Sequence, residues 1–305
     1  MCKKQRKKGP LYLIKQTVSY NFILWRKNVR VIAVFILAFI LCFLLSDKVI
    51  GFAEAQGESV QIVEPFIWTF GDSNSILLSS FLLLLLYADM PFITTATPFF
   101  LIRENRKTWV LGQLVYIALS TLLYMGFMLL STCLLCVKNA YLGNRWSKTA
   151  AILAYSDLGE EMEIPVAVKA LEMSRPYQCV IWVFLLMLLY TLTMVFLMMF
   201  FHIWKGQRFG FISVYFFSCY GLILNPMQIQ KILNLPKELY YKARVILGWI
   251  SPLNHASFPM HNFGYDKLPR IWQSEVLFLG ILVLLVMLTV WGMQRYSFQF
   301  KGTEG

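Results

Sequence analysis

The chain has 305 residues, of which 58% are apolar and 14% are charged, and its formal net charge is +12. Its mean hydropathy is +0.60, whereas soluble domains usually carry about 25% charged residues. This composition excludes a water-soluble globular domain, so the sequence predicts an all-α integral membrane protein.

The N-terminal segment, residues 1–30, is basic and then amphipathic. Apolar side chains recur in it at helical spacing, while polar ones fall on the other side, which predicts a helix lying in the inner membrane interface. An inner extension of the first span is the alternative. The basic cluster at 3–8 fits anionic lipid headgroups better than nucleic acid. The apolar positions are Leu11, Ile14, Val18, Phe22 and Trp25.

Six apolar runs follow, and a bilayer core needs about 20 apolar residues in a helix. The first run is slightly short, and the third has thirty positions without a charge. A cleaved signal peptide is not expected, because the segment before the first run is far too long for the basic n-region of a signal peptide. We predict six transmembrane helices, at about 31–46, 75–93, 108–137, 178–204, 209–230 and 276–294.

The orientation follows from the distribution of lysine and arginine. With the N-terminus inside, the cytoplasmic segments hold sixteen basic and three acidic residues, a charge of +13, and the outer segments have a charge of −1. Positive charge is retained on the cytoplasmic side of membranes. The prediction is therefore a multi-pass plasma-membrane protein with both termini, including the tail at 295–305, in the cytoplasm.

The link between the second and third runs is longer than a plain connection between antiparallel helices needs. It mixes apolar and basic residues and lacks a flexible Gly/Ser composition. Two interpretations stay open at this point. The link is either a short helix with an apolar face for a partner or a loop that anchors lipid headgroups.

Three further candidates lie elsewhere in the chain. Pro236 predicts the start of a surface or re-entrant helix that Ser251-Pro252 would stop, with an irregular loop as the alternative. His255, His261 and Asp266 could form a metal or acid–base site, but polar residues at a membrane boundary are the favoured interpretation. Cys133 and Cys136 form a CxxC in an uncharged run with no further ligands nearby, so packing is favoured over metal binding.

The order of these elements resembles the membrane subunit of a bacterial type-2 ATP-binding cassette (ABC) exporter. The local likeness lies in YADMPF (87–92), RENRKTWVLGQ (103–113) and WISPLNH (249–255). In that family the link after the second span contains a coupling helix that docks on the ATPase subunit. One departure is that no Gly-Thr follows an acidic residue in this link. The resemblance implies coupling residues Thr97, Pro98, Phe99, Phe100, Arg103, Glu104, Arg106 and Lys107.

The resemblance also implies the partners. No G-x-x-x-x-G-K-[ST] phosphate loop occurs, so we expect ATP hydrolysis in separate ABC ATPase subunits, and neither enzymatic activity nor a cofactor or metal in this chain. A second permease, identical or related, would complete the transport path. Expected substrates are an antimicrobial peptide, a lipid-like molecule or a hydrophobic drug.

Two alternatives to an exporter are a non-transporting scaffold or sensor subunit and a secondary carrier. A carrier usually needs charges deep in the membrane, but Asp89 and Glu275 lie near the ends of the predicted spans.

Overall fold

The computed structural model describes residues 9–94, 96–103, 105–162, 164–223, 226–234, 236–264 and 266–298. Helices dominate this part of the chain, which confirms the all-α prediction; the described strands are two short parallel partners, β1 and β2. The first half contains α1 (Pro10–Trp25), α2 (Val29–Gln56), β1 (Val60–Gln61), α3 (Glu64–Phe70), α4 (Ser73–Leu84), η1 (Leu85–Tyr87), α5 (Thr97–Arg103), α6 (Arg106–Cys136), η2 (Val137–Asn139) and β2 (Ala140–Tyr141).

The second half centres on α10, which packs against α11, α15 and α6. Its elements are α7 (Lys148–Tyr155), α8 (Leu158–Glu161), α9 (Val168–Met173), α10 (Pro176–Lys205), α11 (Gln207–Ile223), α12 (Pro226–Ile232), η3 (Lys237–Leu239), α13 (Tyr240–Ile250), α14 (Pro252–Ala256), η4 (Phe258–Met260) and α15 (Ile271–Arg295).

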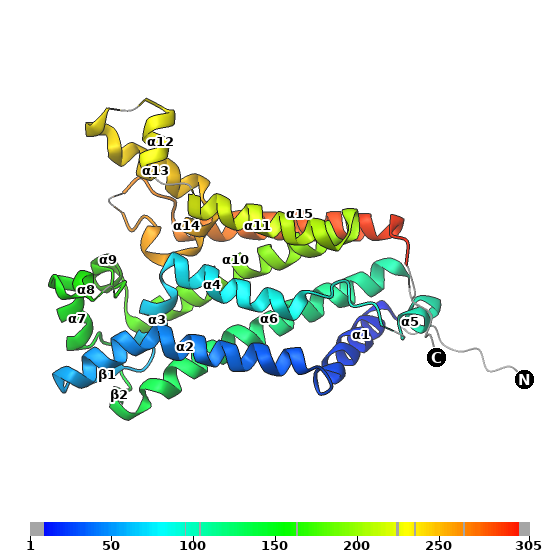
Figure 1. The fold of residues 1–305 in the computed structure, drawn as a ribbon, viewed down its shortest axis with the longest axis horizontal. Coiled ribbons are helices and arrows are strands. Elements are labelled where there is room, and N and C mark those ends of the chain that lie inside the picture. Colours follow the sequence, from blue (N-terminus) through cyan, green and yellow to red (C-terminus); the bar gives the residue numbers. More distant parts are fainter. Residues whose placement is uncertain are drawn as a thin grey trace, which may run out of the picture.

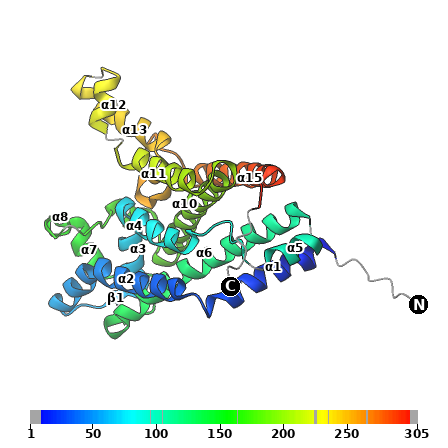
Figure 2. The ribbon, with the colours of Figure 1, turned by 45° about the vertical axis from the view of Figure 1, so that its right-hand side comes forward.

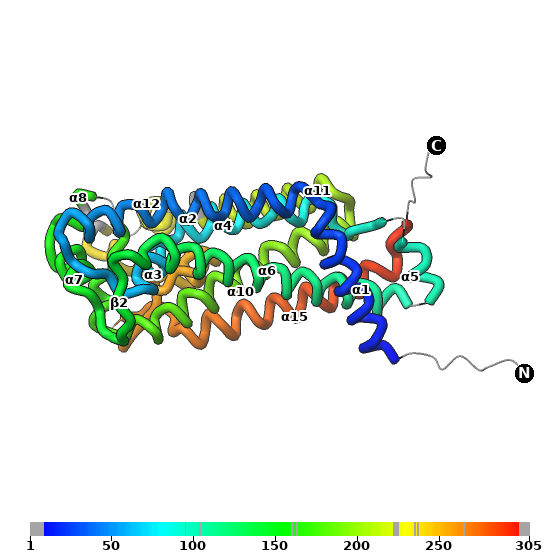
Figure 3. Tube along the Cα trace, turned by 90° about the horizontal axis from the view of Figure 1, so that it is seen from below, coloured from blue at the N-terminus to red at the C-terminus, as the bar shows by residue number. Residues whose placement is uncertain are grey.

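The long helices lie side by side in one elongated bundle (Figure 1). Helix α5 and the end of α15 lie at one end, hereafter the α5 end, and α7, α8 and the strands lie at the other, hereafter the α7 end. Helices α12 and α13 project from the side of the bundle (Figure 2). Seen from below, α1 crosses the bundle near the α5 end (Figure 3).

Four helices in the described part of the chain are long and apolar enough to cross a membrane, namely Val29–Gln56, Arg106–Asn139, Pro176–Lys205 and Ile271–Arg295. The number rises to six if each of two bent helix pairs is one span. These helices are consistent with a multi-pass membrane protein.

The second and fifth predicted spans are not single straight helices. The second, predicted at 75–93, ends as a helix at Tyr87, and it follows α3 at an angle of 89°. The fifth, predicted at 209–230, consists of α11 and α12, which are bent by 84°. Prolines account for the helix limits, because Pro91 restricts the residue before it and Pro226 cannot donate a helical hydrogen bond.

The first span also departs from its predicted length. The apolar run at 31–46 continues as helix to Gln56, beyond the charged Asp47 and Lys48. The Asn28 side chain accepts a hydrogen bond from the Arg30 amide at the start of α2, and Gly57, with φ of 65°, ends the helix. Hydropathy located the apolar part of this helix, whereas the capping residues set its limits.

Buried polar side chains join the long helices to one another. The Tyr87 hydroxyl lies 2.7 Å from Ser120 Oγ and 2.9 Å from Thr121 Oγ1. Ser80 Oγ lies 3.0 Å from Thr191 Oγ1. Contacts of this kind hold helices together where lipid replaces water, because hydrophobic burial gives little driving force there.

Candidate functional site

Helix α5 lies within the predicted coupling link and begins in a threonine turn. The Thr97 hydroxyl accepts a hydrogen bond of 2.8 Å from the Thr94 amide and lies 3.4 Å from Thr94 Oγ1. Thr97 is buried, although the helix around it lies at the edge of the molecule. This turn starts the seven-residue helix directly before Pro98, a residue suited to the first turn of a helix.

The two faces of α5 differ sharply. Phe99 is 67% exposed and Ile102 is 81% exposed, and their spacing of three residues places them on one face. Phe100 and Leu101 pack against the main core instead, and the Phe100 ring lies edge-on to Tyr20 of α1 with 5.4 Å between centroids. The helix is thus anchored on one face and presents an apolar ridge, Phe99 and Ile102, on the other.

The start of α6 holds the end of α15. Arg106 donates from Nη1 to the carbonyl oxygens of Gln294 at 3.2 Å and Tyr296 at 2.9 Å. Its guanidinium also lies 5.4 Å from the centre of the Phe298 ring, and Trp109 packs on the same ring. A guanidinium suits this position because it carries several donors in a fixed plane.

The segment between η1 and α5 is tied to two more parts of the bundle. Asp89 accepts a hydrogen bond of 2.6 Å from Arg30 at the start of α2. Gln207 donates from Nε2 to the Ala88 carbonyl at 2.8 Å, and His202 Nδ1 lies 3.0 Å from the Met90 carbonyl. A cavity of about 500 Å³ lies between this segment, the α10–α11 connection and the end of α15.

The structure places the predicted link residues in different environments. Phe99, Arg103 and Lys107 are exposed, whereas Thr97 is buried and Pro98 and Phe100 are half-buried. Glu104 lies outside the described residues. The sequence pattern missed Ile102, although its spacing from Phe99 was a usable signal. It also missed the contacts of Arg106 and Gln207, since these partners lie far away in the sequence.

The N-terminal helix α1 makes polar contacts with α6 that the predicted pattern did not include. Asn21 donates from Nδ2 to Gln113 Oε1 at 2.8 Å, and Trp25 Nε1 donates to the Tyr116 hydroxyl at 2.6 Å. One turn earlier, Thr17 packs so closely on Gly112 that a Cβ there would lie 2.8 Å from Thr17 Cβ. Helix α1 is therefore docked on α6, and it is separate from α2.

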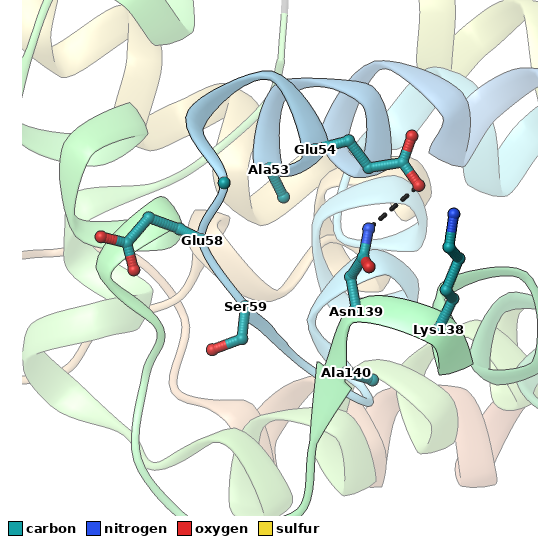
Figure 4. Close-up of a pocket in the computed structure, with 8 residues that line it drawn as sticks. Ala53, Glu54, Glu58, Ser59, Lys138, Asn139 and Ala140 are labelled. Atoms are coloured by element: carbon teal, nitrogen blue, oxygen red, sulfur yellow. Dashed lines mark hydrogen bonds between the residues drawn. The ribbon is translucent and has the colours of Figure 1, made fainter.

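The α7 end holds an open groove of about 550 Å³ beside the end of α2. Figure 4 shows Glu54 facing Asn139, which donates to it at 3.0 Å, with Lys138 beside them. Glu58 pairs with Lys148 at 3.2 Å. The carboxylates of this groove are thus already engaged by neighbouring side chains, and the groove is a solvated surface rather than a reactive site.

The predicted His255–His261–Asp266 group is divided in the structure. Asp266 pairs with Lys169 of α9. The two imidazoles instead share a residue that the sequence pattern missed, Ser274 of α15, whose Oγ lies 2.7 Å from His255 Nδ1 and 2.8 Å from His261 Nε2. Burial lowers the pKa of both imidazoles, to about 4 for His261, although backbone carbonyls oppose the shift.

The described part of the chain therefore holds two unusual groupings: the α5 ridge with its anchoring contacts, and the histidine–serine cluster at the opposite end. Comparison of the chain with protein-family models, curated proteins and solved structures found no match.

Proposed function

We propose that this chain is the permease subunit of an ABC exporter, and that α5 docks on a separate ATPase subunit. In this proposal the chain has six spans in a bacterial plasma membrane, with both termini in the cytoplasm. It pairs with a second permease, identical or related, and lines half of a path for a hydrophobic substrate. ATP is hydrolysed by the partner, because the sequence has no phosphate loop.

The observation that carries this proposal is the apolar ridge of α5. Apolar side chains exposed along the long helices suit contact with lipid, but α5 has seven residues and lies at the end of the bundle. Its ridge is bordered by Arg103 and Lys107, which are exposed. An apolar anchor with charged residues at its rim is the arrangement that fits a protein partner.

The contacts of the link support a coupling role for this ridge. The link and the start of α6 contact α1 through Phe100, α2 through Asp89 and the end of α15 through Arg106. A displacement of α5 by a partner would therefore be transmitted to several long helices at once, because packed elements move as units.

The docking experiment compares two phenylalanines of equal exposure. Phe99 is 67% exposed on α5, and Phe216 is 66% exposed on α11. The full tagged chain is purified from its own cells in mild detergent, and an ABC ATPase is sought by mass spectrometry. We expect Phe99→Ala to reduce the bound ATPase at least tenfold, as loss of a central anchor does, while Phe216→Ala leaves it unchanged.

Absence of any ABC ATPase from the wild-type preparation, or equal losses in both variants, would refute the proposal. An ATPase that binds through Phe99 without supporting export would instead favour the scaffold alternative.

The orientation is tested separately with single cysteines in a chain that lacks its native cysteines. At positions Asn105 and Gln207 they should be protected from an impermeant thiol reagent in intact cells, and at Gly143 and Asn262 they should react. Labelling at position 105 from outside would overturn the cytoplasmic placement of α5, which rests on the excess of basic residues in these segments.

A further inference from the structure

Ser274 sits between two buried imidazoles at the α7 end of the bundle. Ser274, His255 and His261 are 0%, 2% and 0% exposed, respectively. His255 belongs to α14, His261 follows η4, and Ser274 lies in the first turn of α15. In each imidazole, one ring nitrogen contacts the Ser274 hydroxyl and the other contacts backbone carbonyl oxygen.

The carbonyl contacts fix one hydrogen on each ring. His255 Nε2 lies 3.0 Å from the Trp249 oxygen, and His261 Nδ1 lies 3.0 Å from the Ser257 oxygen and 3.2 Å from the Phe258 oxygen. Carbonyl oxygens only accept hydrogen bonds, so both of these nitrogens must be donors. A neutral imidazole has a single N–H, and in each ring it is now assigned.

The two remaining nitrogens then compete for one hydroxyl hydrogen. His255 Nδ1 and His261 Nε2 both point at Ser274 Oγ, at 2.7 and 2.8 Å. The hydroxyl can donate to one of them only. The other contact pairs two lone pairs unless its nitrogen carries a hydrogen. All four ring nitrogens make hydrogen bonds when the two rings hold three hydrogens between them, which is one proton more than two neutral imidazoles possess.

We propose that His255, Ser274 and His261 form a proton-binding site that takes up one shared proton from solution and thereby fixes the segment from Trp249 to His261 to α15. The proton resides on the ring nitrogen to which the serine hydroxyl does not donate a hydrogen bond, and the hydroxyl hydrogen turns toward the other ring. This inference does not rest on the proposed transport function.

A second proton is disfavoured at the same site. With four ring hydrogens the Ser274 oxygen would accept twice, and its own hydrogen would have no acceptor among the two rings. Two buried positive charges would also repel each other. The pair therefore titrates as one unit, with one proton bound long before the second.

The charged groups around the cluster affect how readily it binds a proton. Lys169 of α9 acts on His261 and disfavours its charge, but its ammonium is paired with Asp266. Arg270 and Glu275 flank Ser274 on α15, and Arg244 lies on α13. In the described part of the chain, neither imidazole makes a hydrogen bond or ion pair with any of these three side chains. The same holds for Tyr190 of α10, Cys219 of α11 and Asp72 before α4.

Burial and the shared hydroxyl predict opposite responses to acid. With burial alone, both folded-state pKa values lie below the unfolded value of about 6.5, so the α7 end would lose stability as the pH falls below that value. A proton required by the Ser274 contacts opposes this loss, because the folded state then binds the first proton with an affinity similar to that of the unfolded state.

The experiment uses the full chain in detergent micelles with ¹⁵N-labelled histidine, since the sequence has three histidines and a His202→Gln variant identifies the third. Nitrogen shifts are followed from about pH 8 to pH 4.5, a range that includes the usual imidazole pKa. We expect His255 and His261 to share a single proton over this range. Ser274→Ala, which removes the competition, should lower the midpoint by at least about one pH unit, and Ser274→Thr should keep it.

Two results would overturn the proposal. One is a wild-type pair that stays neutral down to about pH 4.5, or in which each ring gains a full proton at the same midpoint. The other is a Ser274→Ala variant that titrates like the wild type. If that variant does not fold, the wild-type titration alone still decides.

Discussion

The two ends of the bundle differ in whether their side chains find partners within the chain. At the α7 end, the buried carboxylate of Glu64 finds its partners within the chain: it is 1% exposed and accepts hydrogen bonds from the Ser147 amide at 2.7 Å and the Ser147 hydroxyl at 2.5 Å. At the α5 end, Phe99 and Ile102 point away from the molecule while the residues behind them are anchored. The α7 end thus holds a buried carboxylate by internal contacts, whereas the α5 end exposes apolar side chains. The comparison predicts where substitutions change folding and where they change association.

The largest effect on folding is expected at Glu64. Glu64→Ala leaves two buried donors of Ser147 without an acceptor, and we expect a loss of about 2–4 kcal/mol in the free energy of unfolding. Glu58→Ala is the control, because its partner Lys148 has a side chain that is 78% exposed, and exposed pairs contribute below about 1 kcal/mol. Thermal unfolding in detergent measures both, and equal losses would mean that Glu64 does not hold α3 to α7.

A smaller effect is expected where α1 docks on α6. Gly112→Ala places a methyl group 2.8 Å from Thr17 Cβ, which must displace α1, at a cost of about 1–3 kcal/mol. Gly126 lies in the same helix with nothing within 4 Å of a Cβ. Gly126→Ala should therefore be neutral or slightly stabilising, because alanine favours helix. Similar stability of the two variants would show that α1 is not seated on α6.

The smallest of the three effects on folding is expected at Arg106. Arg106→Ala removes two hydrogen bonds to the end of α15, and we expect a loss of about 1 kcal/mol together with faster proteolysis of the C-terminal segment. Lys107→Ala, at the exposed neighbouring position, should change neither quantity. A normal cleavage rate in the Arg106 variant would mean that Arg106 does not hold the end of α15.

Sequence reasoning was most successful where the signal is a long apolar run. The third predicted span lies within the continuous helix Arg106–Asn139, formed by α6 and η2, and the fourth and sixth lie within α10 and α15. The helix expected after Pro236 is present as η3 and α13. It failed at breaks, because hydropathy averages over the proline and glycine positions that end or bend a helix. The second and fifth spans illustrate this limit.

The polar clusters were harder to predict than the spans, because their members are distant in sequence. His255 and His261 were identified from their spacing, but Ser274 was not, since a serine at the start of an apolar helix carries no local signal. The same holds for Asn21 and Gln113, whose contact joins positions 92 residues apart. Thr17 and Asn21 were not among the positions that the helical pattern identified.

The connection between α10 and α11 has a consequence for how the chain enters the membrane during synthesis. A single residue, Gly206, separates the two helices, and its φ of 96° is one that side chains other than glycine rarely adopt. The two helices pack against each other. If α11 is a span, as in the six-span proposal, the single connecting residue predicts that α10 and α11 enter the membrane together as one helical hairpin.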